Sequence, residues 1–197
     1  MDNSAPTDEI GLDELWAEIR SLGLESYIKD LDRDGYTVIP PEIANPNNLC
    51  QRLLEVCLSI AETRNGVRPD LLNGKSLNTN SVIGDTLKAI FLEDPVFEEA
   101  LMHPALLAIS TYLCGYDLVL SSLSFQAKGP SDLKFKLHTD TRLPSPLPAR
   151  ALLCKCIFAL TDFNRDHGST AFVPGSQDWA RNPIGKEKVF GEEGSQY

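Results

Sequence analysis

The chain has 197 residues, of which 42% are hydrophobic and 23% are charged, a composition that fits a single globular domain. Its formal net charge of -10 makes a nucleic-acid partner unexpected, because a negative surface repels phosphate. Apolar runs fall short of the roughly 18 residues that indicate a membrane span. The acidic, polar start lacks the features of a signal peptide, so we expect a cytoplasmic protein, with the peroxisome left open.

The first part of the chain is predicted to be mainly helical. Residues 1–10 are expected to be disordered, and 11–197 to form one domain. Apolar residues at steps of three and four predict helices in five segments: 12–30, 46–64, 83–92, 95–102 and 104–114. Gly115 is expected to close the last helix. A short strand is predicted at 36–39 and a polar loop at 67–80.

The second part of the chain is predicted to form strands. The segments with this pattern are 118–126, 134–138, 152–160 and 169–173. Residues 151–160 are almost continuously apolar, which indicates a central strand that is buried on both faces. Helices followed by strands predict an α+β fold, with a β core flanked by N-terminal helices.

The five cysteines are expected to be reduced thiols, because their number is odd and the chain shows no secretion signal. Cys154 and Cys156 form a C-x-C pair, and on a strand both side chains would point to the same face. We interpret them as two small buried hydrophobic residues. A zinc site would need two further ligands, and the sequence shows no matching pair.

The strongest chemical pattern is His138-Thr139-Asp140. A histidine and a carboxylate two residues apart at a strand end project to one side, where they can take adjacent positions around one metal ion. Ferrous iron in oxygenases binds two histidines and one carboxylate on one face of an octahedron. By itself the tripeptide is common, and it could equally be a surface histidine beside a turn aspartate.

The flanking sequence favours the metal interpretation. Its informative blocks are Asp34–Pro40, Glu93–Phe97, His103–Leu107, Phe125–Pro130, Leu137–Asp140, Ala159–Phe163, His167–Thr170 and Val173–Ser176. In these blocks and in the spacing between them, the chain resembles the phytanoyl-CoA dioxygenase family of Fe(II)- and 2-oxoglutarate-dependent oxygenases. The resemblance covers nearly the whole chain.

This resemblance implies a cupin-like double-stranded β-helix, or jelly roll, with iron between its two sheets. His138 and Asp140 would be two of the three iron ligands. Gln126 would contact 2-oxoglutarate, although a polar strand residue facing solvent is an equal alternative. The complete enzyme would use Fe(II) and 2-oxoglutarate to hydroxylate a small organic or acyl substrate.

The sequence departs from the family pattern after Trp179, where the family has a second histidine ligand and then an arginine for 2-oxoglutarate. His103 and His167 are expected to serve in a cap and a turn rather than as the third ligand. We therefore expect a domain that lacks its C-terminal strands and binds both cofactors weakly or not at all. The alternative is a truncated, non-catalytic relative that binds a small molecule or a protein, and a zinc hydrolase is a weaker third possibility.

Overall fold

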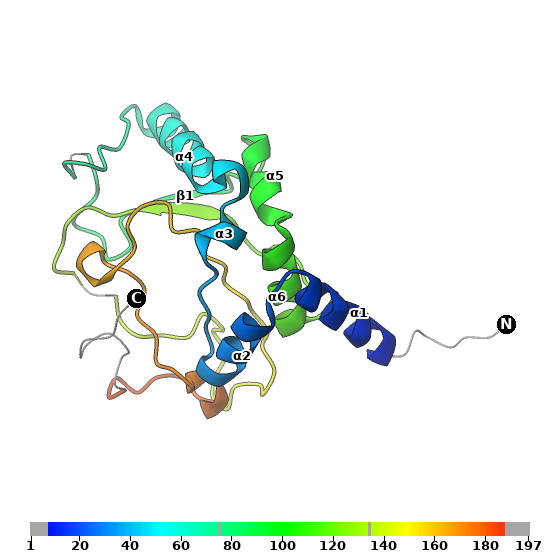
Figure 1. Ribbon diagram of the computed structural model, residues 1–197. Helices are drawn as coiled ribbons and strands as arrows, with labels where there is room; N and C mark the ends of the chain where they lie inside the picture. Colours follow the sequence, from blue (N-terminus) through cyan, green and yellow to red (C-terminus); the bar gives the residue numbers. More distant parts are fainter. Residues whose placement is uncertain (1–7, 75, 134, 188–197) are drawn as a thin grey trace.

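The computed structural model describes residues 8–74, 76–133 and 135–187, with the side chains of 8–10 left out. Its elements are α1 (Asp8–Ser21), α2 (Glu25–Asp34), α3 (Pro41–Ala44), η1 (Pro46–Asn48), α4 (Leu49–Asn65), β1 (Asp85–Lys88), α5 (Pro95–Leu101), α6 (Pro104–Cys114), β2 (Ser124–Ala127), η2 (Arg165–His167) and η3 (Ser176–Trp179) (Figure 1). Within these ranges, every helix is too short or too polar to span a bilayer.

One apolar cluster joins α1, α2 and α6. Leu15 and Ile19, four residues apart on α1, are buried against α6, as the three-and-four spacing of apolar residues requires. The segment predicted as one helix is two, because the chain turns after Ser21 and Leu24 donates its N–H back to the Ile19 carbonyl at 2.9 Å. The first helix begins at Asp8, inside the segment expected to be disordered, and residues 1–7 lie outside the described ranges.

A second apolar cluster joins α4, α5 and the small sheet. Its buried members are Leu49, Leu53, Cys57, Ile60, Ala61, Leu87, Ile90, Val96, Phe97 and Ala100. The helix predicted at 46–64 is confirmed as α4, preceded by the 3-10 turn η1, and those predicted at 95–102 and 104–114 are confirmed as α5 and α6. Gly115 closes α6, as predicted, by donating its N–H to the Thr111 carbonyl at 2.8 Å.

The sheet is a two-stranded antiparallel pair in which Leu87 of β1 faces Phe125 of β2. The helix predicted over 83–92 is therefore wrong, because pairing with β2 outweighs the local apolar spacing. Gly84 precedes β1 with φ 70°, and a Cβ there would lie 2.2 Å from the Ala127 carbonyl oxygen. Only glycine lets the two backbones approach so closely.

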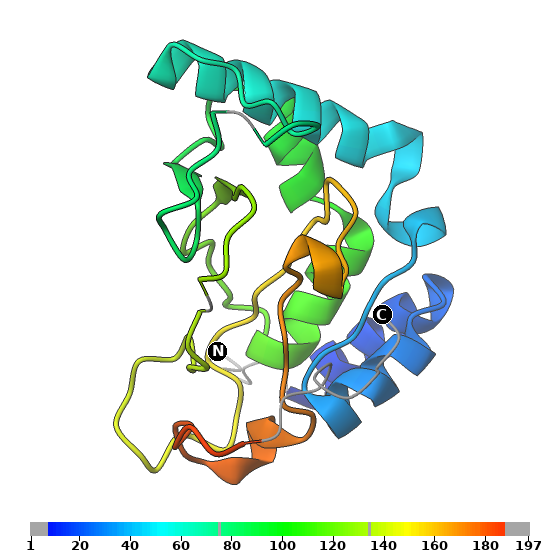
Figure 2. The ribbon, with the colours of Figure 1, turned by 90° about the vertical axis from the view of Figure 1, so that its left-hand side faces the viewer.

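The described residues form no strand at 36–39, 152–160 or 169–173, where strands were predicted. Of the strand predicted at 134–138, residues 135–138 are described, and they are not in a strand either. From 118–126 only Ser124–Gln126 lies in a strand. The residues after α6 run largely as irregular chain (Figure 2). A strand needs a hydrogen-bonded neighbour, and the described chain pairs only β1 with β2. The result is a mixed helical and antiparallel fold, compatible with α+β, whose described strands do not build the expected jelly roll.

Candidate metal centre

His138 and Asp140 lie side by side, as their spacing predicted. The Nε2 atom of His138 is 3.5 Å from the Oδ1 atom of Asp140. Both side chains are partly open to solvent, with 43% and 39% of their surfaces exposed. Two ligand atoms about 2.1 Å from one metal and at right angles to each other lie about 3 Å apart, so the pair is close to the spacing of adjacent ligands.

The backbone fixes which nitrogen of His138 faces the carboxylate. Nδ1 lies 2.8 Å from the Lys136 carbonyl oxygen, which can only accept a hydrogen bond, so Nδ1 carries a proton and donates it. In the neutral ring Nε2 then presents a lone pair toward Asp140. Two electron-rich atoms face each other, and a proton or a cation between them would stabilise the arrangement. A carbonyl that holds the distal nitrogen of a histidine is the usual support of a metal ligand.

Lys155 holds the other carboxylate oxygen. Its Nζ atom lies 2.7 Å from Oδ2 of Asp140, which leaves Oδ1 directed at His138. This hydrogen bond lowers the pKa of the Asp140 carboxyl below its usual value, against the opposing effect of burial. Asp140 is therefore ionised at neutral pH, the form in which a carboxylate binds metal.

The remaining two histidines lie elsewhere. His103 is buried and donates from Nε2 to the Ile43 carbonyl at 3.0 Å, so it ties α6 to α3. His167 is exposed, and its Nδ1 lies 2.9 Å from the side-chain oxygen of Asn164, the residue before η2. Across 8–187, leaving aside 75 and 134, no group of three His, Cys, Asp or Glu side chains is placed to hold a metal ion. The donor set of His138 and Asp140 fits iron as a half-site.

Gln126 lies on β2, opposite Thr86 of β1. Its side chain is exposed and points away from the face that carries Phe125 and Ala127, because neighbouring strand residues alternate. The Thr86 hydroxyl beneath it is buried, and the described residues offer it no hydrogen-bond partner. The side chain of Gln126 is therefore accessible to a ligand. Its contact with 2-oxoglutarate stays a prediction.

Comparison with known families shows the ancestry of the chain. The model of the phytanoyl-CoA dioxygenase family matches residues 31–194, which is most of the sequence. The chain belongs to the phytanoyl-CoA dioxygenase family. The dioxygenase af480 of Aspergillus fumigatus is 28% identical over 87 residues, a match that covers 44% of this chain and 28% of that protein. No solved structure matches.

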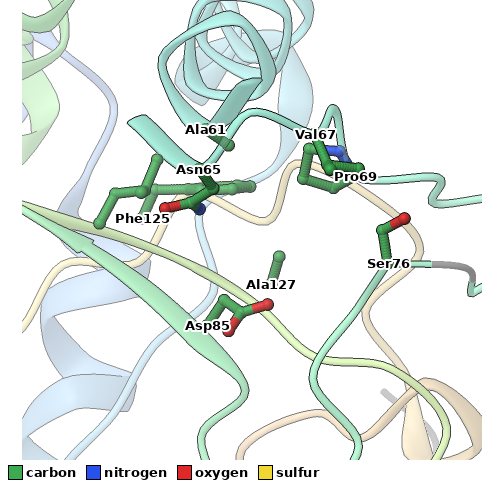
Figure 3. Close-up of a pocket in the computed structure, with 9 residues that line it drawn as sticks. Ala61, Asn65, Val67, Pro69, Ser76, Asp85, Phe125 and Ala127 are labelled. Carbon is green, nitrogen blue, oxygen red and sulfur yellow. The ribbon is translucent and has the colours of Figure 1, made fainter. Parts of the chain in front are cut away.

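The chain also has a cavity of about 440 Å³ between α4, the loop after it and the sheet. Figure 3 shows side chains from all three parts of the chain around it, including Asn65, Ser76 and Asp85. The volume falls in the range of small-molecule sites. Asp85 also has a structural contact, because its Oδ2 accepts the Asn78 N–H at 3.2 Å. His138, Asp140 and Gln126 are not among the residues that line this cavity.

Two residues that contact the His138–Asp140 pair were missed in the sequence. Lys155 falls between Cys154 and Cys156, so the alternation that places the cysteines on one face directs Lys155 to the other. Phe135 packs its ring edge-on to His138, with 4.6 Å between ring centroids. The alternation offered a signal for Lys155, whereas the pairing with Asp140 depends on the path of the loop between them.

Proposed function

We propose that this chain carries part of the active site of an Fe(II)- and 2-oxoglutarate-dependent dioxygenase that oxidises a small organic or acyl substrate. The observation that carries the proposal is the His138 Nε2 atom facing the Asp140 Oδ1 atom at 3.5 Å in a member of the phytanoyl-CoA dioxygenase family. We propose the jelly roll as the architecture of the complete protein, with strands added to the extended segments described above.

Each residue near the half-site has a role in this proposal. His138 binds the metal through Nε2, and the Lys136 carbonyl holds the ring in that orientation. Asp140 binds through Oδ1, while Lys155 holds Oδ2 and keeps the carboxyl ionised. Phe135 covers one side of the imidazole and limits access of water there. Ferrous iron, when bound with 2-oxoglutarate, supplies the oxidising power for attack on an aliphatic carbon.

The third ligand and the 2-oxoglutarate contacts complete the proposed site. We assign the third ligand to a residue other than His103 and His167, because both are held by other partners. Gln126 is the residue proposed to contact 2-oxoglutarate, since its exposed amide can donate to a carboxylate. The match spans 28% of the length of the curated relative, so the activity is proposed for the whole protein of which this half-site is a part.

The half-site is tested by titrating the purified chain with Fe(II) under anaerobic conditions and measuring the binding by calorimetry. We expect weak Fe(II) binding, and we expect His138→Ala to lower the affinity by at least about tenfold. Loss of a residue that supports a metal ligand already lowers metal affinity by about that factor, and loss of the ligand itself should lower it at least as much. His167→Ala is the matched control, since that histidine is exposed and bound only locally. Equal binding by the wild-type and His138→Ala chains would refute the iron assignment and favour a non-catalytic binding module.

The role of Gln126 is tested in the same titration with 2-oxoglutarate present. We expect 2-oxoglutarate, whose oxo and carboxylate groups both reach the metal, to tighten Fe(II) binding more than succinate does. Gln126→Ala should reduce this gain, whereas Ser124→Ala, two residues away on the same exposed face of β2, should retain it. An unchanged gain in Gln126→Ala would mean that the amide faces solvent without a ligand.

A further inference from the structure

The second chemical feature of the extended segment is a pair of thiols. The Sγ atoms of Cys154 and Cys156 lie 3.8 Å apart, so the two side chains share a face, as their spacing predicted. The expectation that both are buried apolar residues is wrong, because Cys154 is half-buried and Cys156 is exposed. The predicted strand 152–160, on which both cysteines were placed, is not formed in the described chain. Cys156 is thus the more exposed residue of the pair, with its sulfur lying against α6.

Helix α6 forms the other side of this thiol pair. The Ser110 hydroxyl, buried on α6, lies 3.6 Å from Sγ of Cys156 and 3.8 Å from Sγ of Cys154. Cys114 follows Ser110 by one helical turn, and both burial and the nearby Cys156 raise the pKa of its thiol. A rigid helix thus holds the hydroxyl group between the two sulfur atoms.

The hydrogen bonds around the sulfurs make the two thiols unequal. The hydrogen bond between the two sulfur atoms lowers the pKa of Cys156, with a smaller contribution from Ser110, against the effect of burial. The same interaction raises the pKa of Cys154. Cys156 thus carries the nucleophilic thiolate, and Cys154 keeps its proton.

We propose that Cys154 and Cys156 form a redox-active dithiol that closes reversibly to a disulfide by exchange with a low-molecular-weight disulfide such as glutathione disulfide. The Cys156 thiolate attacks one sulfur of the small disulfide, which releases one thiolate and leaves a mixed disulfide on Cys156. Cys154 then loses its proton to solvent and attacks the Cys156 sulfur, which releases the second small thiolate. The protein loses two electrons and two protons, and one small disulfide becomes two thiols.

The backbone permits this closure. Cα atoms two residues apart on an extended chain are about 6.6 Å apart, within the range of about 4.4–6.8 Å found for disulfides. The sulfurs need only approach from 3.8 Å to bonding distance by side-chain rotation and a small bend. A disulfide whose Cα atoms are near the upper limit of this distance range is readily reduced, which suits a reversible switch rather than a structural crosslink.

Disulfide mapping tests the proposal without reference to iron. The full reduced chain is incubated with glutathione disulfide, alkylated and digested with trypsin, which cuts after Lys155. We expect the peptides 151–155 and 156–165 to remain joined by a disulfide and to separate on reduction. Bridges that involve Cys114 instead, or mixed glutathione disulfides without any internal bridge in the wild-type chain, would overturn the proposal.

Single variants assign the two steps. Cys154→Ser should trap a glutathione on Cys156, and Cys156→Ser should abolish the bridge, whereas Cys57→Ser, in the helical core, is the matched control that retains it. Ser110→Ala should slow the attack by Cys156 about fivefold, the effect of one lost hydrogen bond, while the far-ultraviolet circular dichroism stays unchanged. A Cys154→Ser chain that takes up glutathione at Cys57 or Cys114 rather than at Cys156 would contradict the assigned order.

Discussion

The helical part of the chain, up to α6, and the extended part after it are built in different ways. The helical part contains both apolar clusters, with Phe97, Ile19 and Leu49 almost completely buried. The extended part leaves large apolar side chains in solvent, among them Ile157 at 52% and Phe163 at 43% exposure. Its backbone contributes one described strand, β2, which pairs back onto the helical part.

This difference separates stability from chemistry. Burial of apolar surface dominates the folding free energy, so most of the stability comes from the helical part. The His138–Asp140 pair and the thiol pair both lie in the extended part, and the thiol pair packs against α6 through Ser110. Both proposed sites therefore lie in the part with less buried apolar surface, as is common for functional loops.

The largest expected effect is on the core of the helical part. Phe97→Ala should lower the free energy of unfolding by about 3–5 kcal/mol, because it leaves a cavity in a fully buried position. Phe163→Ala, in the extended part, should change it by less than about 0.5 kcal/mol. Urea unfolding followed by circular dichroism measures both. Similar losses from the two variants would mean that the extended part is equally well packed.

Thiol reactivity compares the two parts directly. Burial raises the pKa of Cys57 on α4 to about 12, whereas hydrogen bonds lower that of Cys156 to about 6. A thiolate is the reactive form, and its fraction grows as the pH rises through the pKa. At pH 7 iodoacetamide should therefore alkylate Cys156 more than about a hundredfold faster than Cys57, even though a low-pKa thiolate is the weaker nucleophile.

The pH profile of the alkylation, read by mass spectrometry of each peptide, sharpens the result. The rate at Cys156 should rise between about pH 5 and pH 7 and then level off. Cys154→Ser keeps a donor beside Cys156 and should preserve that profile, whereas Cys154→Ala should move the rise to higher pH. A profile for Cys156 that continues to rise above pH 8 would contradict the hydrogen-bonded thiolate.

A smaller effect is expected at the start of α5. The Asp94 side chain accepts the Val96 N–H at 2.9 Å and caps the helix. Asp94→Ala should therefore destabilise the protein by about 1 kcal/mol, whereas Asp162→Ala, an exposed carboxylate in the extended part, should have little effect. Thermal unfolding of both variants measures the difference, and an Asp94→Asn chain should recover most of the loss.

The smallest effect is expected at the surface ion pair between α4 and α5. Arg52 donates to the two carboxylate oxygens of Glu99 at 2.7 and 2.5 Å, and this lowers the pKa of Glu99. A lowered pKa contributes stability above the carboxyl's ordinary pKa, and that stability is lost as the pH falls through the folded value. Glu99→Gln should thus be slightly less stable than wild type at neutral pH and equal to it in strong acid.

Salt distinguishes this weak pair from the buried contacts. Both side chains are more than 40% exposed, so added sodium chloride should reduce the difference between Glu99→Gln and wild type. The difference caused by Phe97→Ala should persist in the same buffers. A salt-independent loss at Glu99 would indicate that the pair supports packing between α4 and α5 rather than a screened charge interaction.

The sequence predicted α4, α5 and α6 because the information that defines these helices is local. Pro104–Cys114 carries a proline at its start and a glycine after its end, and these residues mark α6 at both ends. The closeness of the His138 and Asp140 side chains could also be predicted, since the two residues are two positions apart. These features depend on the spacing of residues that are close in the chain, and this spacing can be read directly from a single sequence.

The extended part could not be predicted, because strands depend on partners that are distant in sequence. The apolar run at 152–160 has the composition of a central strand, yet the described chain gives it no hydrogen-bonded neighbour. Conversely, the segment of β1 was predicted to be a helix, because its partner strand β2 lies some forty residues further along the chain. The contact of Lys155 with Asp140 was missed for the same reason.

The order Cys154-Lys155-Cys156 has a mechanical consequence. The two sulfur atoms face α6, while the ammonium group between them reaches Asp140 on the opposite side. Lys155 thus lies between two cysteines whose sulfur atoms point one way, while its own ammonium group points the other way. Drawing the two sulfur atoms together would bend this backbone, so the oxidation state of the thiols would be transmitted as a displaced positive charge beside Asp140.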